Sequence, residues 1–339
     1  MSDEKWNLKK QMNSKWKGKW EVMRMKSKNF TEEYVSINGI TQYMLHYPKK
    51  GSKDVVVMLH GGPGAPNSYI GYYLEPYFNF CNVVYYDQRG AGKTQIKSKM
   101  PLEDHTWEAI IEDLRQTVTY LKEKYETDRI ILCGHSFGSM LGMNFIEKYP
   151  EDVLAFIGYG VVTNAEEQEK VFYESLKQSV LSSGDKKDIK KFNAVDPNFP
   201  LVDKEAFTKG VNIMSALQMK HGYYKNKYMP ILRKSPLMSF KDMMQFQKGV
   251  KHNSKLIGEV EYQFDMTGTT NYQVPIFFVL GAQDEWTCSE LAARYFETIQ
   301  APEKGLYRIE EAGHFVDTDQ PEKFCGKIKE ILEQLQSKG

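Results

Sequence analysis

The stretch IILCGHSFG, residues 130–138, joins a short apolar run to the pattern G-x-S-x-G, with Ser136 at its centre. The apolar run is typical of a strand buried on both faces, and residues 138–149 have a helical pattern that Pro150 ends. A turn this sharp forces strained backbone angles on Ser136, and glycine two positions to either side lets the chain close. Ser136 would stand at a helix N-terminus, where the helix dipole favours developing negative charge. The stretch therefore predicts a nucleophilic serine on a strand-to-helix turn.

Strands and helices alternate on both sides of this turn. Hydrophobic patterning predicts strands at 34–37, 41–47, 55–59, 82–86, 130–133, 153–159, 275–280 and 305–309, and helices at 106–125, 138–149, 288–299 and 321–336. The first two strands flank Asn38-Gly39, a strong hairpin signal. Strands that alternate with helices indicate an α/β fold, with a mostly parallel central sheet and helices on both faces.

Two segments do not fit this alternation. Residues 163–270 have a helical pattern, are rich in Lys, Met and Tyr, and fall between two predicted sheet strands. We expect them to form an inserted helical cap on a core of residues 31–162 and 271–339. Residues 1–30 hold nine Lys/Arg against three Asp/Glu, with tryptophans at roughly helical spacing, which predicts a basic amphipathic extension. Packing of these tryptophans on the protein body is favoured over contact with an anionic membrane surface.

A serine is inert at neutral pH without a general base, and His314 is the histidine in the right place to act as one. It follows the strand at 305–309 within a few residues and precedes the last predicted helix. Asp284, just past the preceding strand, is the candidate that orients His314 and stabilises its imidazolium. The chain order Ser, Asp, His is that of the α/β-hydrolase triad. We therefore predict Ser136, Asp284 and His314 as the catalytic residues, with Glu285 as the only local rival of Asp284.

The anionic tetrahedral intermediate of acyl transfer needs hydrogen-bond donors that are fixed before the reaction. The backbone N–H of Phe137, directly after the serine, is the first candidate. The second is expected in the loop HGGPG at 60–64, which follows the strand at 55–59. Because glycine lets this backbone approach the oxyanion closely, we predict the N–H of Gly62 as the second donor and Gly61 as a substrate-binding residue.

Three motifs carry a family resemblance. HGGPG at 60–64, DQRGAGKT at 87–94 and GHSFGS at 134–139 resemble the motifs of the prolyl aminopeptidase (proline iminopeptidase) family within the α/β hydrolases. The first two are fairly specific to that family and its close relatives, whereas the third occurs across many hydrolases. The resemblance covers the predicted core and not the cap. It implies an α/β-hydrolase fold with an inserted helical cap.

The C-terminal segment GAQDEWTC at 281–288 resembles the G-x-x-D-E-x-T-P segment of one branch of that family. In that branch the glutamate after the catalytic aspartate binds the free amino terminus of the substrate, which implies this role for Glu285. Cys288 replaces the proline of the pattern. That branch also supplies a glutamate from the cap, and Glu259 and Glu261 are the nearest carboxylates here.

Composition argues against several other classes of protein. The balance of 45 Lys/Arg against 44 Asp/Glu gives no sign of a nucleic-acid partner. The four cysteines are scattered without zinc-site spacing, so we expect no metal and no cofactor, and a reducing, cytoplasmic compartment. No apolar run reaches the about 18 residues of a membrane span. Residues 90–94 resemble the end of a phosphate-binding loop, but Asp87 stands where that motif needs its first glycine.

These observations predict a serine hydrolase that acts through an acyl-enzyme. The resemblance implies an aminopeptidase of the proline iminopeptidase type, which releases an N-terminal residue from small peptides or amides. The alternative is an esterase, lactonase or amidase that acts on a small acyl substrate without a free amine. The cap decides between them, with Tyr223 and Tyr224 as candidate substrate-binding residues of its wall. A catalytically silent binding protein is disfavoured, because no member of the predicted triad is missing.

Overall fold

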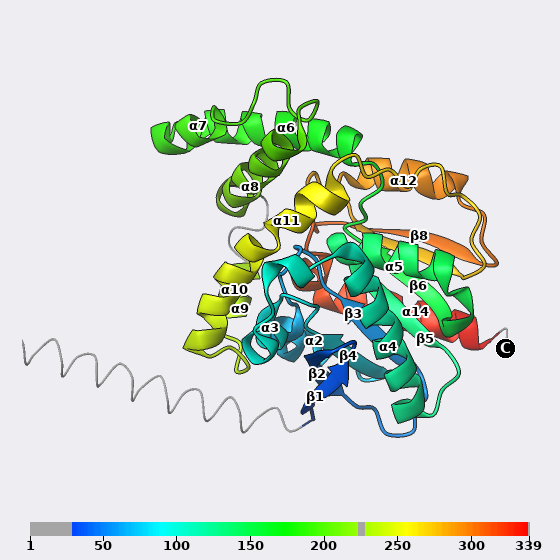
Figure 1. Cartoon of the computed structure of the whole chain (residues 1–339). Helices are drawn as coiled ribbons and strands as arrows, with labels where there is room; N and C mark the ends of the chain where they lie inside the picture. Colours follow the sequence, from blue (N-terminus) through cyan, green and yellow to red (C-terminus); the bar gives the residue numbers. More distant parts are fainter. Residues whose placement is uncertain (1–28, 223–227, 338–339) are drawn as a thin grey trace, which may run out of the picture.

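The computed structural model describes residues 29–222 and 228–337 (Figure 1). The predicted N-terminal extension lies outside the described residues except for its last two positions. Tyr223 and Tyr224, the predicted wall residues of the cap, also lie outside them.

The described residues form one eight-stranded sheet in the order β1-β2-β4-β3-β5-β6-β7-β8. Its strands are β1 (Thr31–Ile37), β2 (Ile40–Tyr47), β3 (Val55–Leu59), β4 (Asn82–Tyr86), β5 (Ile130–His135), β6 (Val153–Tyr159), β7 (Ile276–Gly281) and β8 (Lys304–Ile309). The pairs β1–β2 and β2–β4 are antiparallel, and the other neighbouring pairs are parallel. The predicted α/β fold with a mostly parallel sheet is therefore confirmed.

Helices cover both faces of this sheet. The helical elements are η1 (Ser68–Ile70), α2 (Gly71–Leu74), α3 (Gly92–Ser98), η2 (Leu102–Asp104), α4 (Trp107–Tyr125), α5 (Phe137–Lys148), η3 (Pro150–Asp152), α6 (Ala165–Ser182), α7 (Lys186–Phe192), α8 (Lys204–His221), α9 (Tyr228–Arg233), α10 (Phe240–His252), α11 (Ser254–Leu256), η4 (Ile257–Glu261), α12 (Ser289–Thr298), α13 (Val316–Asp319) and α14 (Pro321–Gln336). Strand β3 shows why both faces are apolar. Val55, Val57 and Leu59 join the core under α4, α5 and α12, whereas Val56 and Met58 join the core under α2, α13 and α14.

The helices between β6 and β7, from α6 to η4, are called the cap helices below. Figure 1 shows α6, α7 and α8 gathered at one end of the molecule, away from β1 and β2. These three helices share an apolar cluster of their own, which includes Phe172, Phe192 and Phe207. The cap helices therefore have a separate small core while they remain in contact with the sheet domain through α10 and α3.

Candidate active site

Ser136 joins β5 to α5 with backbone angles of φ 53° and ψ −122°. A positive φ is strained for serine, so the surrounding chain must hold it. A Cβ at Gly138 would lie 2.1 Å from the carbonyl oxygen of Leu59, and one at Gly134 would lie 2.5 Å from that of Gly138. Glycine at both positions therefore lets α5 start close against β3 and β5, with Ser136 at the sharp turn between them.

The loop that follows β3 lies directly against Ser136. A Cβ at Gly61 would be 3.0 Å from the Cβ of Ser136, and Gly62 has a φ of 122° that favours glycine. Gly61 and Gly62 line the same cavity as Ser136. Phe137 begins α5, so its N–H is one of the first four that have no partner within the helix. Both predicted oxyanion donors thus belong to segments that contact or adjoin the serine.

The DQRG segment holds this loop in place, a role that sequence reasoning did not assign. The backbone N–H of Gln88 donates to His60 Nε2 at 3.0 Å, and Gln88 Nε2 donates to the carbonyl oxygen of His60 at 2.9 Å. Burial lowers the pKa of His60 to about 4, so the ring is neutral at pH 7. Since Nε2 accepts, the proton belongs on Nδ1, which donates to the carbonyl oxygen of Gly61 at 2.9 Å. The two motifs therefore form one hydrogen-bonded unit behind the loop at 60–64, which is called the oxyanion loop below after its predicted role.

Asp284 and His314 are brought together by the ends of β7 and β8. The Oδ2 of Asp284 lies 3.0 Å from Nδ1 of His314, and the two residues are only 5% and 2% exposed. Burial alone would raise the pKa of Asp284, but the charge of His314 and hydrogen bonds from His314 and Thr287 bring that pKa below its ordinary value. Because Nδ1 faces Asp284, Nε2 is the ring nitrogen that remains to accept a proton. His314 and Ser136 line the same cavity.

Neighbouring residues fix this pair. Asp284 accepts hydrogen bonds from Thr287 Oγ1 at 2.7 Å and from the backbone N–H groups of Trp286 and Thr287 at 2.9 and 3.1 Å. On the other side, Nε2 of His135 donates to the carbonyl oxygen of His314 at 3.0 Å. The residue before the serine thus positions the loop that carries His314. Thr287 could have been noticed in the sequence, because it lies in the segment that resembles D-E-x-T.

A cavity of about 510 Å³ lies between the sheet domain and the cap helices. Ser136, His314, Gly61 and Gly62 form part of its wall, and most of the rest is apolar. Three carboxyl groups also line it, those of Glu169, Glu261 and Asp317, and none of the described lining residues is Lys or Arg. Its size suits a small organic ligand.

Glu285 does not take the position that the resemblance implied. It is exposed, its carboxylate accepts a hydrogen bond from Ser175 Oγ in α6, and it is not among the described residues that line the cavity. The physical reason is the turn after Asp284. The N–H groups of Trp286 and Thr287 fold around the carboxylate of Asp284, which directs the intervening residue outward.

Glu169 in α6 and Glu261 at the end of the π-helical turn η4 face the cavity instead. Glu169 is 4% exposed, and its Oε2 has no hydrogen-bond partner among the described residues. Burial raises the pKa of both groups to about 8, and for Glu169 the nearby Glu261 adds to the effect. None of the ion pairs among the described residues gives either group the cation that a buried carboxylate needs.

The sequence does hold a signal for Glu169. Ala165, Phe172 and Leu176 are buried on one stripe of α6, and Glu169 lies on that stripe between the first two. A carboxylate at an apolar-stripe position of an amphipathic helix is unusual, since such groups are almost never fully buried unless paired. Glu261 was already among the carboxylates considered, but nothing in its local sequence directed it toward the cavity.

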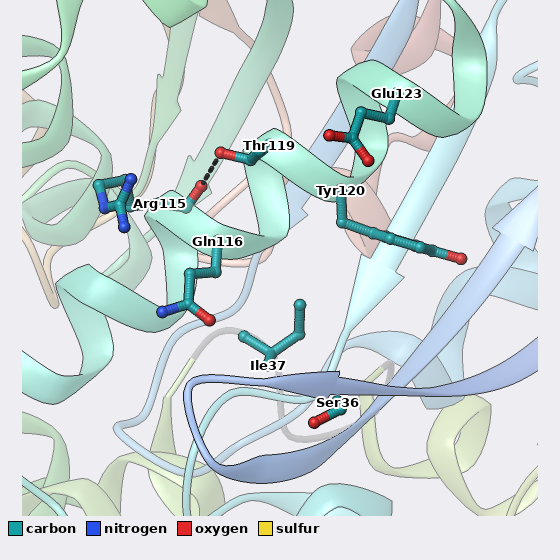
Figure 2. Close-up of a pocket in the computed structure, with 7 residues that line it drawn as sticks. All are labelled: Ser36, Ile37, Arg115, Gln116, Thr119, Tyr120 and Glu123. Atoms are coloured by element: carbon teal, nitrogen blue, oxygen red, sulfur yellow. Dashed lines mark hydrogen bonds between the residues drawn. The ribbon is translucent and has the colours of Figure 1, made fainter.

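A second hollow, of about 270 Å³, lies between the β1–β2 hairpin and α4 (Figure 2). Its wall includes Ser36, Arg115 and Glu123, and Arg115 is paired with Glu112 on the same helix. Thr119 donates to the carbonyl oxygen of Arg115 at 3.0 Å, as Figure 2 shows. The side chains there point along a solvated helix face and contain no nucleophile–base pair, so we assign no site to it.

Within residues 29–222 and 228–337, no cluster of three or more His, Cys, Asp or Glu residues could hold a metal ion. None of the helices in the same ranges is long and apolar enough to cross a membrane.

The parallel sheet, the strained Ser136 turn and the Asp284–His314 pair define an α/β hydrolase, a class of enzymes. Residues 50–321 match the model of the serine aminopeptidase (S33) family, and the chain belongs to this family.

Two relatives and one solved structure that are similar to this chain agree with this assignment. A probable aminopeptidase, YbaC, from Bacillus subtilis is 23% identical over 319 residues, which cover 91% of this chain and 95% of that protein. A proline iminopeptidase from Saccharolobus solfataricus is 25% identical over 323 residues, covering 93% and 96%. The crystal structure of a proline iminopeptidase-related protein from Thermus thermophilus has a TM-score of 0.61 at 19% identity, covering 90% of this chain and 98% of that one. The last similarity concerns the fold alone.

Proposed function

We propose that the protein is a serine aminopeptidase, which hydrolyses an amide or ester bond next to a free α-amino group. The observation that carries the proposal is the pair Glu169 and Glu261 on the wall of the cavity that contains Ser136. A protonated amine bound between them would supply the missing cation. A desolvated, hydrogen-bonded ion pair of this kind is costly to break, on the order of 3–5 kcal/mol.

The proposed reaction uses these side chains as follows. The Oγ of Ser136 attacks the carbonyl carbon and passes its proton to Nε2 of His314. The N–H groups of Gly62 and Phe137 bind the resulting oxyanion. The imidazolium, stabilised by Asp284, gives its proton to the leaving amine or alcohol as the bond breaks. Water then attacks the acyl-enzyme with His314 as base, which regenerates Ser136 and frees the amino acid.

The names of two relatives support the same chemistry, because one is a probable aminopeptidase and the other a proline iminopeptidase. The proposal concerns the free amine of the released residue, whatever its side chain.

The proposal is tested with alanyl- and prolyl-2-naphthylamide and their N-acetylated forms. We expect acetylation to lower kcat/KM by at least 100-fold, because it removes the positive charge. A fluorophosphonate probe should label Ser136, and Ser136→Ala should abolish both labelling and hydrolysis. Equal cleavage of free and acetylated substrates would replace the proposal with an esterase or amidase that needs no amine.

A further inference from the structure

The cavity has two chemically different ends. Glu169 and Glu261 line the cavity together with Val211 and Ile257, which belong to the cap's own apolar cluster, and we take this group as one end. The other end is called the apolar end here and is formed by Ile70, Met219, Tyr228, Met229, Met243 and Phe246. These six residues pack with the core on the α14 face of the sheet. The apolar end therefore packs against a different apolar cluster from the two glutamates, although cap helices supply most of both ends.

One carboxyl group lies at the apolar end. Asp317 is 2% exposed and is close enough to Tyr228 to raise the pKa of that phenol, although burial has the larger effect. Tyr228 in turn stacks on Phe315 with ring centroids 4.4 Å apart. Asp317 accepts hydrogen bonds from Tyr159 Oη at 3.2 Å and from the N–H of Thr318 at 2.8 Å.

The geometry of an aminoacyl amide determines which end of the cavity would hold the α-amine and which would hold the leaving group. The α-amine and the leaving group are attached on opposite sides of the scissile carbonyl group. In a trans amide the chain also continues away from the α-carbon. If the amine lies between Glu169 and Glu261, the leaving group extends from Ser136 toward the apolar end.

We infer that the leaving group is large, apolar and free of negative charge, so that the enzyme cleaves aminoacyl amides or esters of apolar amines or alcohols in preference to dipeptides. This inference rests on the proposed function. Burial of such a group against methionine and aromatic side chains contributes favourable binding free energy, and three flexible methionines can adapt to different shapes.

A dipeptide would bring its C-terminal carboxylate to this end. There it would meet Asp317 in an apolar environment, and none of the described residues that line the cavity is a Lys or Arg that could pair with it. An unpaired buried charge is costly, and a second carboxyl group nearby adds repulsion. The carboxyl group of Asp317 therefore disfavours binding of dipeptides.

The test compares alanyl-phenylalanine with alanyl-phenylalanine amide, which differ only in the terminal charge. We expect kcat/KM to be at least tenfold higher for the amide. Asp317→Asn has the same shape and should reduce that ratio at least threefold. Equal rates on the two substrates, or an unchanged ratio in the variant, would overturn the inference.

A second pair of variants locates the subsite. Met243→Ala should lower kcat/KM for alanyl-2-naphthylamide at least fivefold more than for alaninamide, whose leaving group is ammonia. Met244→Ala is the matched control, because Met244 is the next residue on α10 and is 42% exposed. An equal effect of Met243→Ala on both substrates would place the leaving group elsewhere. These comparisons use only free-amine substrates, so their failure differs from that of the acetylation test.

Discussion

Individual side chains at this site are defined by what surrounds them more than by their type. Asp284 and Glu285 are neighbours in sequence, yet one is buried against His314 and the other is exposed beside Ser175. Glu169 lies 115 residues before Asp284 in the chain and still faces the same cavity as Ser136. Among the ion pairs of the described residues none includes Glu169, and burial without such a partner distinguishes it from the exposed glutamates of the cap.

This burial has a consequence for stability. The pKa of Glu169 and of Glu261 is raised by burial to about 8, from an ordinary value of 4.5. Between these values the folded protein holds more protons than the unfolded chain, so its free energy of unfolding falls as pH rises. We expect the wild-type protein to lose stability from about pH 5 to about pH 8, as measured by urea unfolding.

The double variant Glu169→Gln/Glu261→Gln should lose less stability over the same pH interval. Asp87 and Asp317, whose pKa burial raises to about 7, keep part of the dependence in both proteins. An identical loss in the variant and the wild type would show that the two glutamates titrate as exposed groups do.

At the level of elements, the oxyanion loop depends on a neighbouring loop. Gln88 makes two hydrogen bonds to His60, and His60 bonds to Gly61, which contacts Ser136. Truncation of the Gln88 side chain removes the bond to the His60 carbonyl oxygen while the backbone bond remains. The loop would keep its fold and lose part of its rigidity.

We expect Gln88→Ala to lower kcat about five- to tenfold with little change in KM. This is the effect of about 1–1.5 kcal/mol, the net value of one hydrogen bond. Gln95→Ala is the control, because Gln95 Nε2 makes a similar bond to the Met100 carbonyl oxygen without touching the loop. A rise in KM with kcat unchanged, or equal effects of the two variants, would contradict the positioning role of Gln88.

The sequence could predict the features that local residues determine, and not those that depend on packing between distant segments. The buried strands and the turn at Ser136 are determined by local apolar runs and glycines, so the sheet was predicted within a few residues. Asp284 and His314 follow strand ends of that sheet, and the structure brings them together. The apolar stripe of α6 marks Glu169 as an unusual residue, but the cavity that it faces depends on how α6 packs against the other cap helices, which the local sequence does not encode. Glu285 was expected in the cavity by resemblance, but its side chain follows the turn around Asp284.

For the molecule as a whole, the cap helices complete a cavity that the sheet domain alone leaves open. The sheet domain supplies Ser136, Asp284, His314 and the oxyanion loop, whereas the cap supplies both glutamates and most of the apolar end. In the proposed function, the sheet domain carries out the reaction and the cap selects the substrate. Exchange of the cap helices would alter specificity while the nucleophile and its base remained in place.

The most direct measurement compares kcat/KM for alanyl-2-naphthylamide in Glu169→Gln and in Glu285→Gln. The two variants make the same chemical change, one in a buried residue of the cavity wall and the other in an exposed residue next to Asp284. We predict a loss of at least 50-fold, mainly through KM, in Glu169→Gln and a change of less than threefold in Glu285→Gln. The reverse order, or no loss in Glu169→Gln, would contradict the assignment of the amine site to the cap.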